Sequence, residues 1–184
     1  PELDEEFLKN LGAESVEQLR EQTAESLKGQ KEHAGQGQLR QAATQRLGEM
    51  VDFPVPESLV ASETNSILTN YMGRQMQQGA TEEDLEKNRE ALYAGASEEA
   101  RRKVKLDLIL DDIAKAEKVE VSEEDMSNFL HSYAMQTRRS PDEIVKELQQ
   151  DRGRVLDIQR NILRSKAVGR VVELAEISET NSQS

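Results

Sequence analysis

Hydrophobic positions recur at helical spacing along most of this chain, which predicts helices throughout its length. The first run begins at Glu14, and its apolar positions are Val16, Leu19, Leu27, Leu39, Ala43, Leu47 and Met50. Gly29, Gly35 and Gly37 lie in the middle of this run, and a glycine inside a helix costs about 1 kcal/mol relative to alanine. We therefore predict a long helix that is weakest around these glycines.

Proline and glycine bound the second predicted helix. Pro54-Val55-Pro56 interrupts the first run, and Pro56 suits the first position of a new helix, where the missing N–H is no loss. Gly79 is a suitable stop. The apolar stripe between them comprises Leu59, Val60, Ile67, Leu68, Tyr71, Met72 and Met76.

Capping sequences mark the later helices. Thr81-Glu82-Glu83-Asp84 opens a short helix, and Ser97-Glu98-Glu99 opens a helix that we expect to be the most buried, because apolar positions cover most of its circumference. Ser122-Glu123-Glu124-Asp125 and Ser140-Pro141-Asp142-Glu143 open two more, and a last long helix begins near Arg152. Since no segment alternates as a strand would, the sequence predicts an all-α protein.

Composition adds a prediction of shape to this helical pattern. Apolar residues make up 35% of the 184 residues and charged residues 33%, so the core must be thin for the length. Long amphipathic helices with a narrow buried stripe and a large solvent-exposed face account for the low apolar and high charged content. We therefore expect an elongated body. We assign residues 1–177 to a single helical domain and residues 178–184 to a polar, disordered tail.

Charge and cysteine content exclude several classes of function. The net charge of −12 argues against binding to nucleic acid and to anionic membranes, which require clustered Lys and Arg. The absence of Cys leaves no thiolate nucleophile and is compatible with a reducing cytosol, but it does not establish that location. The location that we expect is the cytoplasm. The start at Pro1, without a Met, indicates a piece of a longer protein.

Candidate catalytic groups are few. His33 and His131 lie far apart and lack a partner at metal-ligand spacing, so both are expected at the surface. Asp107 and Asp111 share one helical face and could in principle bind a divalent cation. The sequence offers no second cluster of carboxylates to complete such a site, so we interpret the two residues as solvated charges. We predict no catalytic residue, metal or cofactor; an enzymatic function would require a metal or cofactor between these two carboxylates.

We interpret the basic residues as part of solvated helix faces and not as a nucleic-acid site. Arg101, Arg102, Lys103 and Lys105 form a run without the interleaved aromatic residues that nucleic-acid stacking requires. Arg160, Arg164 and Arg170 alternate with apolar positions on the last helix, as expected of a solvated face.

Exposed apolar side chains are the remaining candidates for a binding surface. Met is flexible and polarisable, which suits surfaces that accept many partners. A chain of helices with a limited core should expose some of its larger apolar groups, and the candidates are Met72, Met76, Met126, Phe129, Tyr133 and Met135.

Several stretches together resemble the C-terminal, client-binding part of trigger factor, a bacterial ribosome-associated chaperone family. They cover nearly the whole chain: Pro1–Phe7, Glu14–Arg20, Phe53–Val60, Arg101–Leu110 with Ile113-Ala114, Ser140–Val145 and Ala167–Ala175. The order and spacing of these stretches carry the resemblance. It implies an all-α, elongated body with two helical arms, a fold shared with SurA-like chaperones.

The resemblance also implies a function. In the family, an N-terminal domain docks on the ribosome and a separate domain is a prolyl isomerase; neither pattern occurs in this sequence, so we expect neither ribosome docking nor enzymatic activity from it. We expect ATP-independent binding of unfolded or nascent polypeptides, with weak self-association left open. The predicted client-binding residues are Ile67, Tyr71, Met72, Met76, Met126, Phe129, Tyr133, Met135, Ile144 and Leu148.

An alternative remains open: a helical adaptor or structural domain with one fixed protein partner. Several separated apolar patches would favour the chaperone, whereas a single dominant groove would favour the adaptor. At Arg138 and Glu147, where the resemblance leads us to expect apolar or aromatic residues, the sequence carries charges.

Overall fold

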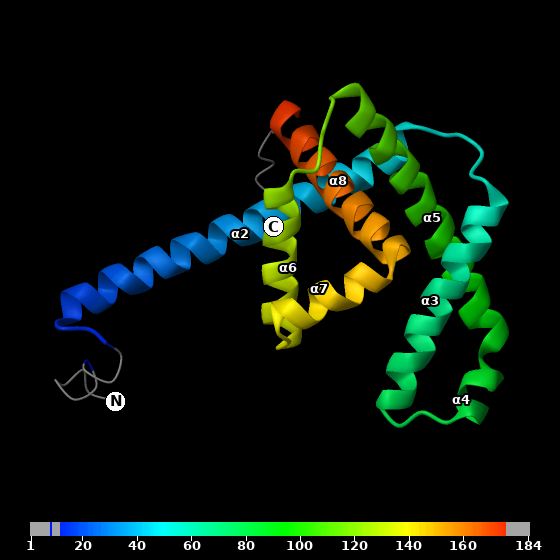
Figure 1. Cartoon of the computed structure of the whole chain (residues 1–184), viewed down its shortest axis with the longest axis horizontal. Helices are drawn as coiled ribbons and strands as arrows, with labels where there is room; N and C mark the ends of the chain where they lie inside the picture. The colour runs from blue at the N-terminus through cyan, green and yellow to red at the C-terminus, as the bar shows by residue number, and fades with distance from the viewer. Residues whose placement is uncertain (1–7, 9–11, 176–184) are drawn as a thin grey trace, which may run out of the picture. The chain divides into compact units, whose positions relative to one another are not determined.

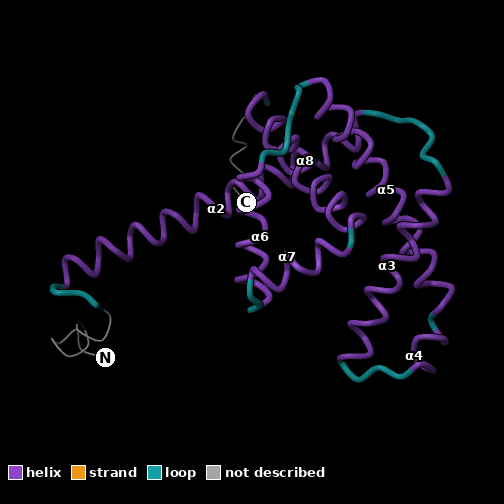
Figure 2. Tube along the Cα trace, viewed as in Figure 1, coloured by secondary structure: helices purple, strands orange, loops and turns teal. Residues whose placement is uncertain are grey.

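A computed structural model describes residue 8 and residues 12–175, and the regular elements in this part of the chain are all helices (Figure 2). This confirms the all-α prediction. The helices are α2 (Val16–Met50), α3 (Glu57–Gln77), α4 (Glu82–Lys87), α5 (Arg89–Ala116), α6 (Glu123–Thr137), α7 (Pro141–Gln150) and α8 (Arg152–Leu174). The predicted boundary at residue 177 and the tail beyond it lie outside the described residues.

The chain divides into two compact units, Pro1–Ala42 and Ala43–Ser184. In the first unit, Leu8 and Ala13 are buried, and the amide of Ala13 donates to the carbonyl of Leu8 at 2.9 Å. The helix α2 continues without interruption through its central glycines, and none of its residues is buried. The second unit holds the remaining helices and three separate hydrophobic clusters.

Helices α3 and α5 form an antiparallel hairpin that is joined through the short helix α4 (Figure 1). Their shared core consists of Val55, Val60, Ala100 and Val104, with Ile67 packed against it. Because Ala100 is completely buried, the two helices approach closely at this point. The hairpin therefore depends on small and β-branched side chains where its helices meet.

The centre of the second unit is the contact between α5 and α8. Leu110 and Ala114 of α5 pack against Ala167 and Val168 of α8, and Leu47 from the end of α2 covers the same cluster. The helix α5 carries more buried residues than any other described helix, which confirms the expectation of a most buried helix in this region.

A third cluster joins α6, α7 and α8 (Figure 1). Ala134 of α6 and Ile144 and Leu148 of α7 form its buried part, and Val155 of α8 packs against them. Glu147, one of the two charged positions noted in the sequence, lies at its edge and accepts two hydrogen bonds from Arg139, the residue after Arg138. These charges hold α7 to the end of α6 instead of lining an apolar surface.

Two predicted capping boxes are present. Thr81 caps α4 together with Asp84, and Ser122 caps α6 together with Asp125. Lys166 of α8 donates to Asp125 at 2.6 Å, and this bond, together with those from Ser122, lowers the pKa of Asp125 to about 2. The start of α7 is also where the sequence predicts it, with Pro141 in the first turn, but the side chain of Ser140 makes no capping bond.

Two predicted helix starts are wrong in detail. Pro56 is the residue before α3 and Glu57 is the first helical residue, a shift of one position. The predicted start at Ser97 does not exist, because α5 begins at Arg89 and continues through Ser97. Ala96 and Ala100 on either side of it are buried, so an unbroken helix packs better here than a capped end would.

Candidate functional site

The hairpin carries an apolar groove on one side. We call it the hairpin groove, and it has a volume of about 620 Å³. Its apolar lining comes from α3, α4 and α5: Leu68, Met72, Met76, Leu85, Leu92 and Tyr93. Asn65, Thr69, Glu86 and Arg89 supply its polar edge. The groove therefore combines side chains that lie up to 28 positions apart in the sequence, and only the turn through α4 brings them together.

Three of the apolar side chains of the hairpin groove are exposed to a partner. Met72, Met76 and Tyr93 are 43%, 51% and 52% exposed, while Leu85 is buried beneath them. Met72 and Met76 are four residues apart on α3, which places them on one face of that helix, on adjacent turns. An apolar surface of this kind is unusual on a chain with so many charged residues, and it marks a place where a partner can bury area.

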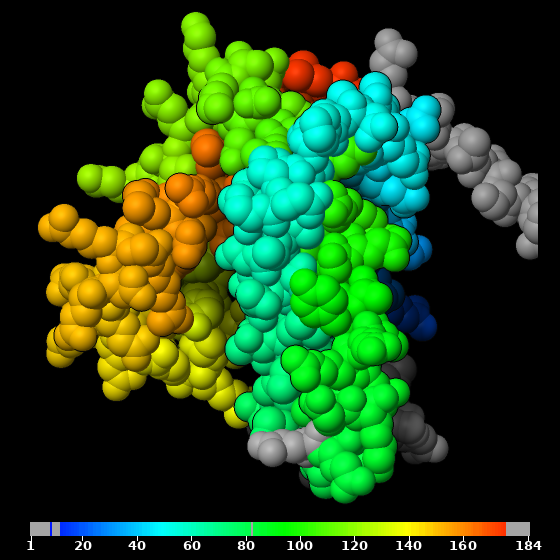
Figure 3. Space-filling view, turned by 90° about the vertical axis from the view of Figure 1, so that its right-hand side faces the viewer, coloured from blue at the N-terminus to red at the C-terminus, as the bar shows by residue number. Residues whose placement is uncertain are grey.

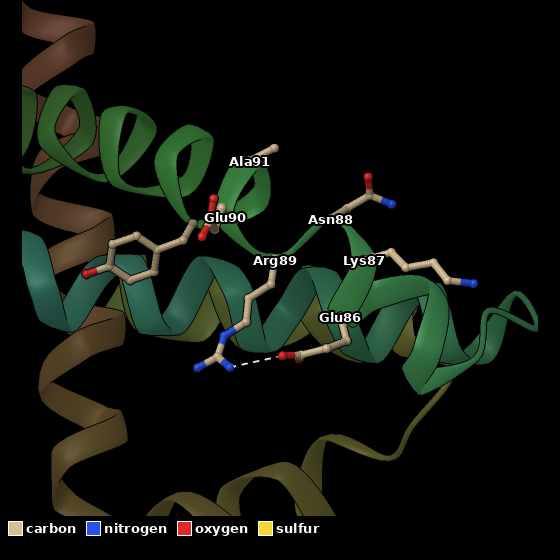
Figure 4. Close-up of a pocket in the computed structure, with 7 residues that line it drawn as sticks. Glu86, Lys87, Asn88, Arg89, Glu90 and Ala91 are labelled. Carbon is tan, nitrogen blue, oxygen red and sulfur yellow. Dashed lines mark hydrogen bonds and ion pairs between the residues drawn. The ribbon is translucent and has the colours of Figure 1, made fainter.

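A hollow edged by charged side chains adjoins the hairpin groove at the junction of α4 and α5 (Figure 4). Glu86 and Arg89, which also edge the groove, form an ion pair at 3.1 Å, and Asn88 separates the two helices. Both side chains of this pair are well exposed, so the pair contributes little to stability. The opposite charges of Glu86 and Arg89 therefore offset each other at the edge of the apolar groove.

Two aromatic side chains, Phe129 and Tyr133, lie together on α6. The rings of Phe129 and Tyr133 are stacked, with centroids 6.1 Å apart. Both are partly buried, and the hydroxyl of Tyr133 accepts a hydrogen bond from Arg154 at 3.4 Å. Met135 is 82% exposed, but it follows Tyr133 by two positions and therefore projects from a different side of α6.

Comparison with known proteins supplies the family. The model of the bacterial trigger factor C-terminus matches residues 15–173. A trigger factor of Opitutus terrae is 37% identical over 97% of this chain and 40% of its own length. Those of Koribacter versatilis and Desulfatibacillum aliphaticivorans are 36% and 32% identical over 82% and 97% of this chain.

The chain belongs to the trigger factor family. It spans 35–41% of the length of these relatives, and the match is to their C-terminal part, a helical domain of the chaperone type. None of the helices within residues 12–175 combines the length and hydrophobicity of a bilayer-spanning segment.

The structure places the predicted client-binding residues of this family member in different environments. Met72 and Met76 lie in the hairpin groove, and Met135 is exposed elsewhere. The remaining predicted residues of α3 and α6 are partly buried: Ile67, Tyr71, Met126, Phe129 and Tyr133. The sequence interpretation missed Leu85, Leu92 and Tyr93 as groove residues, since each falls in a different predicted element from the methionines of α3.

Two of the predicted client-binding residues are buried in the structure. Ile144 and Leu148 are 3% and 7% exposed, and they form the buried part of the cluster between α6, α7 and α8. Side chains this deeply packed cannot contact a client without opening the cluster. Their neighbour Val145, which the helical pattern predicts to face inward, is 37% exposed instead.

Three of the charges predicted to be solvated, Asp107, Asp111 and Arg164, form partly buried ion pairs, whereas Arg160 of α8 is exposed as predicted. Arg164 of α8 contacts Asp107 at 2.7 Å and Asp111 at 2.8 Å, both on α5. Lys103 connects Asp107 to Glu63 of α3, at 3.4 Å and 3.1 Å. The prediction failed for these residues because Arg164, which contacts both carboxylates, lies on another helix, more than 50 positions away in the sequence.

These ion pairs border a cleft of about 640 Å³ between α3, α5 and α8. Figure 3 shows a hollow beside α3, on the side that faces α8. Ser62, Ser66 and Asn70 line it from α3, opposite Arg160 and Asn161 of α8. This concave surface is polar, in contrast to the hairpin groove.

Arg164 supports a testable prediction about stability. Its hydrogen bonds lower the pKa of Asp111, so the pair stabilises the fold above the ordinary aspartate pKa and loses this effect as the pH falls towards the folded value. Arg164→Gln should reduce the free energy of unfolding by about 1–3 kcal/mol at pH 7, because two partly buried carboxylates lose their partner. Urea unfolding measures this loss, which should shrink below about pH 4.

Arg46→Gln is the matched control, since the ion pair of Arg46 with Glu49 is exposed on both sides. Its effect should stay below about 0.5 kcal/mol at every pH. A loss for Arg164→Gln that is equally small, or that grows as the pH falls, would contradict the prediction.

The histidines and carboxylates of the described residues do not gather into a metal-binding cluster. His33 and His131 are both exposed, and Nδ1 of His131 lies 3.1 Å from the carbonyl of Ser127. No group of three metal-ligating side chains occurs among the described residues. The guanidinium of Arg164 contacts both Asp107 and Asp111, the two carboxylates that an enzymatic function would have needed.

Proposed function

We propose that this chain is an ATP-independent chaperone domain that binds unfolded or nascent polypeptides. The observation that carries the proposal is the hairpin groove, in which Met72, Met76 and Tyr93 remain half-exposed on a highly charged protein. The family supplies the class of partner. Isomerase activity and ribosome docking, which the resemblance ascribes to other parts of the family's proteins, are not attributed to these helices.

The physical chemistry of the hairpin groove suits a partner without a fixed sequence. Burial of apolar surface is non-directional, so one groove can accept Leu, Val, Phe or Met from many clients. Met side chains adjust their shape through three rotatable bonds. A groove of this size buries a few client side chains at about 25 cal/mol per Å², which gives short-lived binding and easy release.

Further exposed apolar side chains are distributed over other helices. Met135 of α6 and Leu156 and Leu174 of α8 are each more than half exposed. Together with the edge of the Phe129–Tyr133 stack, they would provide additional weak contacts along a single unfolded chain. Several weak contacts on one scaffold raise overall affinity by effective concentration, while each contact exchanges quickly. This distribution favours the chaperone over an adaptor with one partner. We place this activity in the cytoplasm.

The experiment is aggregation suppression with two unrelated, chemically unfolded enzymes that are diluted into buffer with this chain. Light scattering should fall with increasing chain concentration for both enzymes, and added ATP should change nothing. A protein of similar negative charge without exposed apolar grooves is the control. If neither enzyme is protected, the chaperone proposal fails, and protection of only one would favour the adaptor.

A further inference from the structure

Met72 and Met76 contribute the thioether sulfur atoms that line the hairpin groove. The chain has five Met and no Cys, so methionine is its only sulfur available to an oxidant. Met72 and Met76 are 43% and 51% exposed, and Met50 on α2 is 70% exposed but is not part of the groove. A peroxide can therefore reach the thioethers of the groove without any opening of the fold.

We propose that Met72 and Met76 form an oxidation-sensitive site, at which conversion to methionine sulfoxide weakens the binding of unfolded polypeptide. The proposal rests on the proposed function of the hairpin groove. It assigns a modification, its chemical class and its consequence to two named side chains.

The reaction is an oxygen-atom transfer. A lone pair of the thioether sulfur attacks one oxygen of hydrogen peroxide, the S–O bond forms, the O–O bond breaks, and water leaves after a proton shift. The sulfur is oxidised by two electrons and the peroxide is reduced. Methionine sulfoxide reductase reverses the change with two thiol equivalents, which become a disulfide, and the sulfoxide oxygen leaves as water.

The surroundings of both methionines explain why oxidation acts on binding. Leu68, Leu85 and Leu92 beside them offer an oxygen on sulfur no hydrogen-bond donor, and the uncharged donors of the groove are the side chains of Tyr93, Asn65 and Thr69. Arg89 at the edge is paired with Glu86. An apolar client that covers a sulfoxide must remove its water, and an unpaired polar group in an apolar contact is unfavourable.

The same surroundings explain why oxidation should spare the fold. Neither methionine belongs to the three buried clusters of the second unit. Both can remain hydrated in the unbound protein after oxidation. The site would thus change affinity reversibly while the helices stay folded.

The test compares three proteins before and after mild treatment with hydrogen peroxide: the unmodified chain, the double variant M72L/M76L, and M50L. Each protein is compared with its own untreated sample. Peptide mass spectrometry measures the oxidation of each methionine, circular dichroism measures the fold, and fluorescence anisotropy measures binding to a labelled, permanently unfolded polypeptide.

We expect the affinity of the unmodified chain and of M50L to weaken about fivefold, which corresponds to about 1 kcal/mol. We expect M72L/M76L to lose less affinity than the unmodified chain after peroxide treatment, although it retains the exposed Met135, and methionine sulfoxide reductases with dithiothreitol to restore the affinity of the other two. Helical content should not change in any sample.

Three results would overturn this inference alone: equal weakening of M72L/M76L, unchanged affinity despite oxidised Met72 and Met76, or no oxidation of these two when Met50 is oxidised. Absence of binding by the untreated chain would instead overturn the proposed function, and this inference with it.

Discussion

Replacing Met72, Met76 and Tyr93 together by serine should remove most of the aggregation suppression by this chain. These three side chains are the exposed apolar part of the hairpin groove, each about half exposed before a client covers it. Full burial of one such side chain contributes about 1.5–3 kcal/mol, so the exposed halves of three together should change affinity by at least tenfold. Light scattering against chain concentration measures the change.

The fold of this triple variant should survive, because none of the three residues belongs to a buried cluster. The matched control is Leu27→Ser with Met50→Ser, which removes exposed apolar surface of similar size from α2. The control should suppress aggregation as well as the unmodified chain does. Equal suppression by the triple variant, with a thermal midpoint unchanged in circular dichroism, would exclude the hairpin groove as the binding surface.

Truncating Ile144 to alanine should reduce the free energy of unfolding by about 2–5 kcal/mol, the range for large-to-small changes in a core. Ile144 is 3% exposed and packs with Ala134 and Leu148 in the cluster that joins α6, α7 and α8. Loss of its side chain leaves a cavity that the three helices cannot close without shifting. Urea unfolding followed by circular dichroism measures the effect.

Val145 is the control for this substitution, because it is the next residue of α7 and is 37% exposed. Val145→Ala should cost about 1 kcal/mol or less. At temperatures where Ile144→Ala remains folded, its aggregation suppression should equal that of the unmodified chain. Reduced suppression together with unchanged stability would mean that Ile144 contacts clients directly, as the sequence interpretation supposed.

Local sequence alone determined the helices and most of their ends. Thr81 with Asp84 and Ser122 with Asp125 satisfy the free amides of a first turn within four residues, so such a signal needs no tertiary contact. The stop at Gly79 is equally local, since its φ of +92° is strained for other residues. The family resemblance was also carried by short stretches in a fixed order.

Periodicity could not separate a buried apolar residue from an exposed one on the same stripe. Met76 and Ile144 look alike in the sequence, yet one lies at the open side of the hairpin and the other in the middle of three helices. The difference comes from where α7 packs, which is a contact between distant elements. The continuation of α5 through Ser97 has the same kind of cause, because the burial of Ala96 and Ala100 outweighs a local start signal.

The sequence by itself determined that this chain is helical, where most helices begin, and which family it resembles, because propensity, capping and turn chemistry act over a few residues. Only the tertiary structure decided that Tyr93 joins Met72 and Met76 in one groove, and that Arg164 pairs with Asp107 and Asp111. Those arrangements depend on the packing of helices that are distant in sequence, and apolar burial, which drives that packing, is non-directional and leaves no local signature.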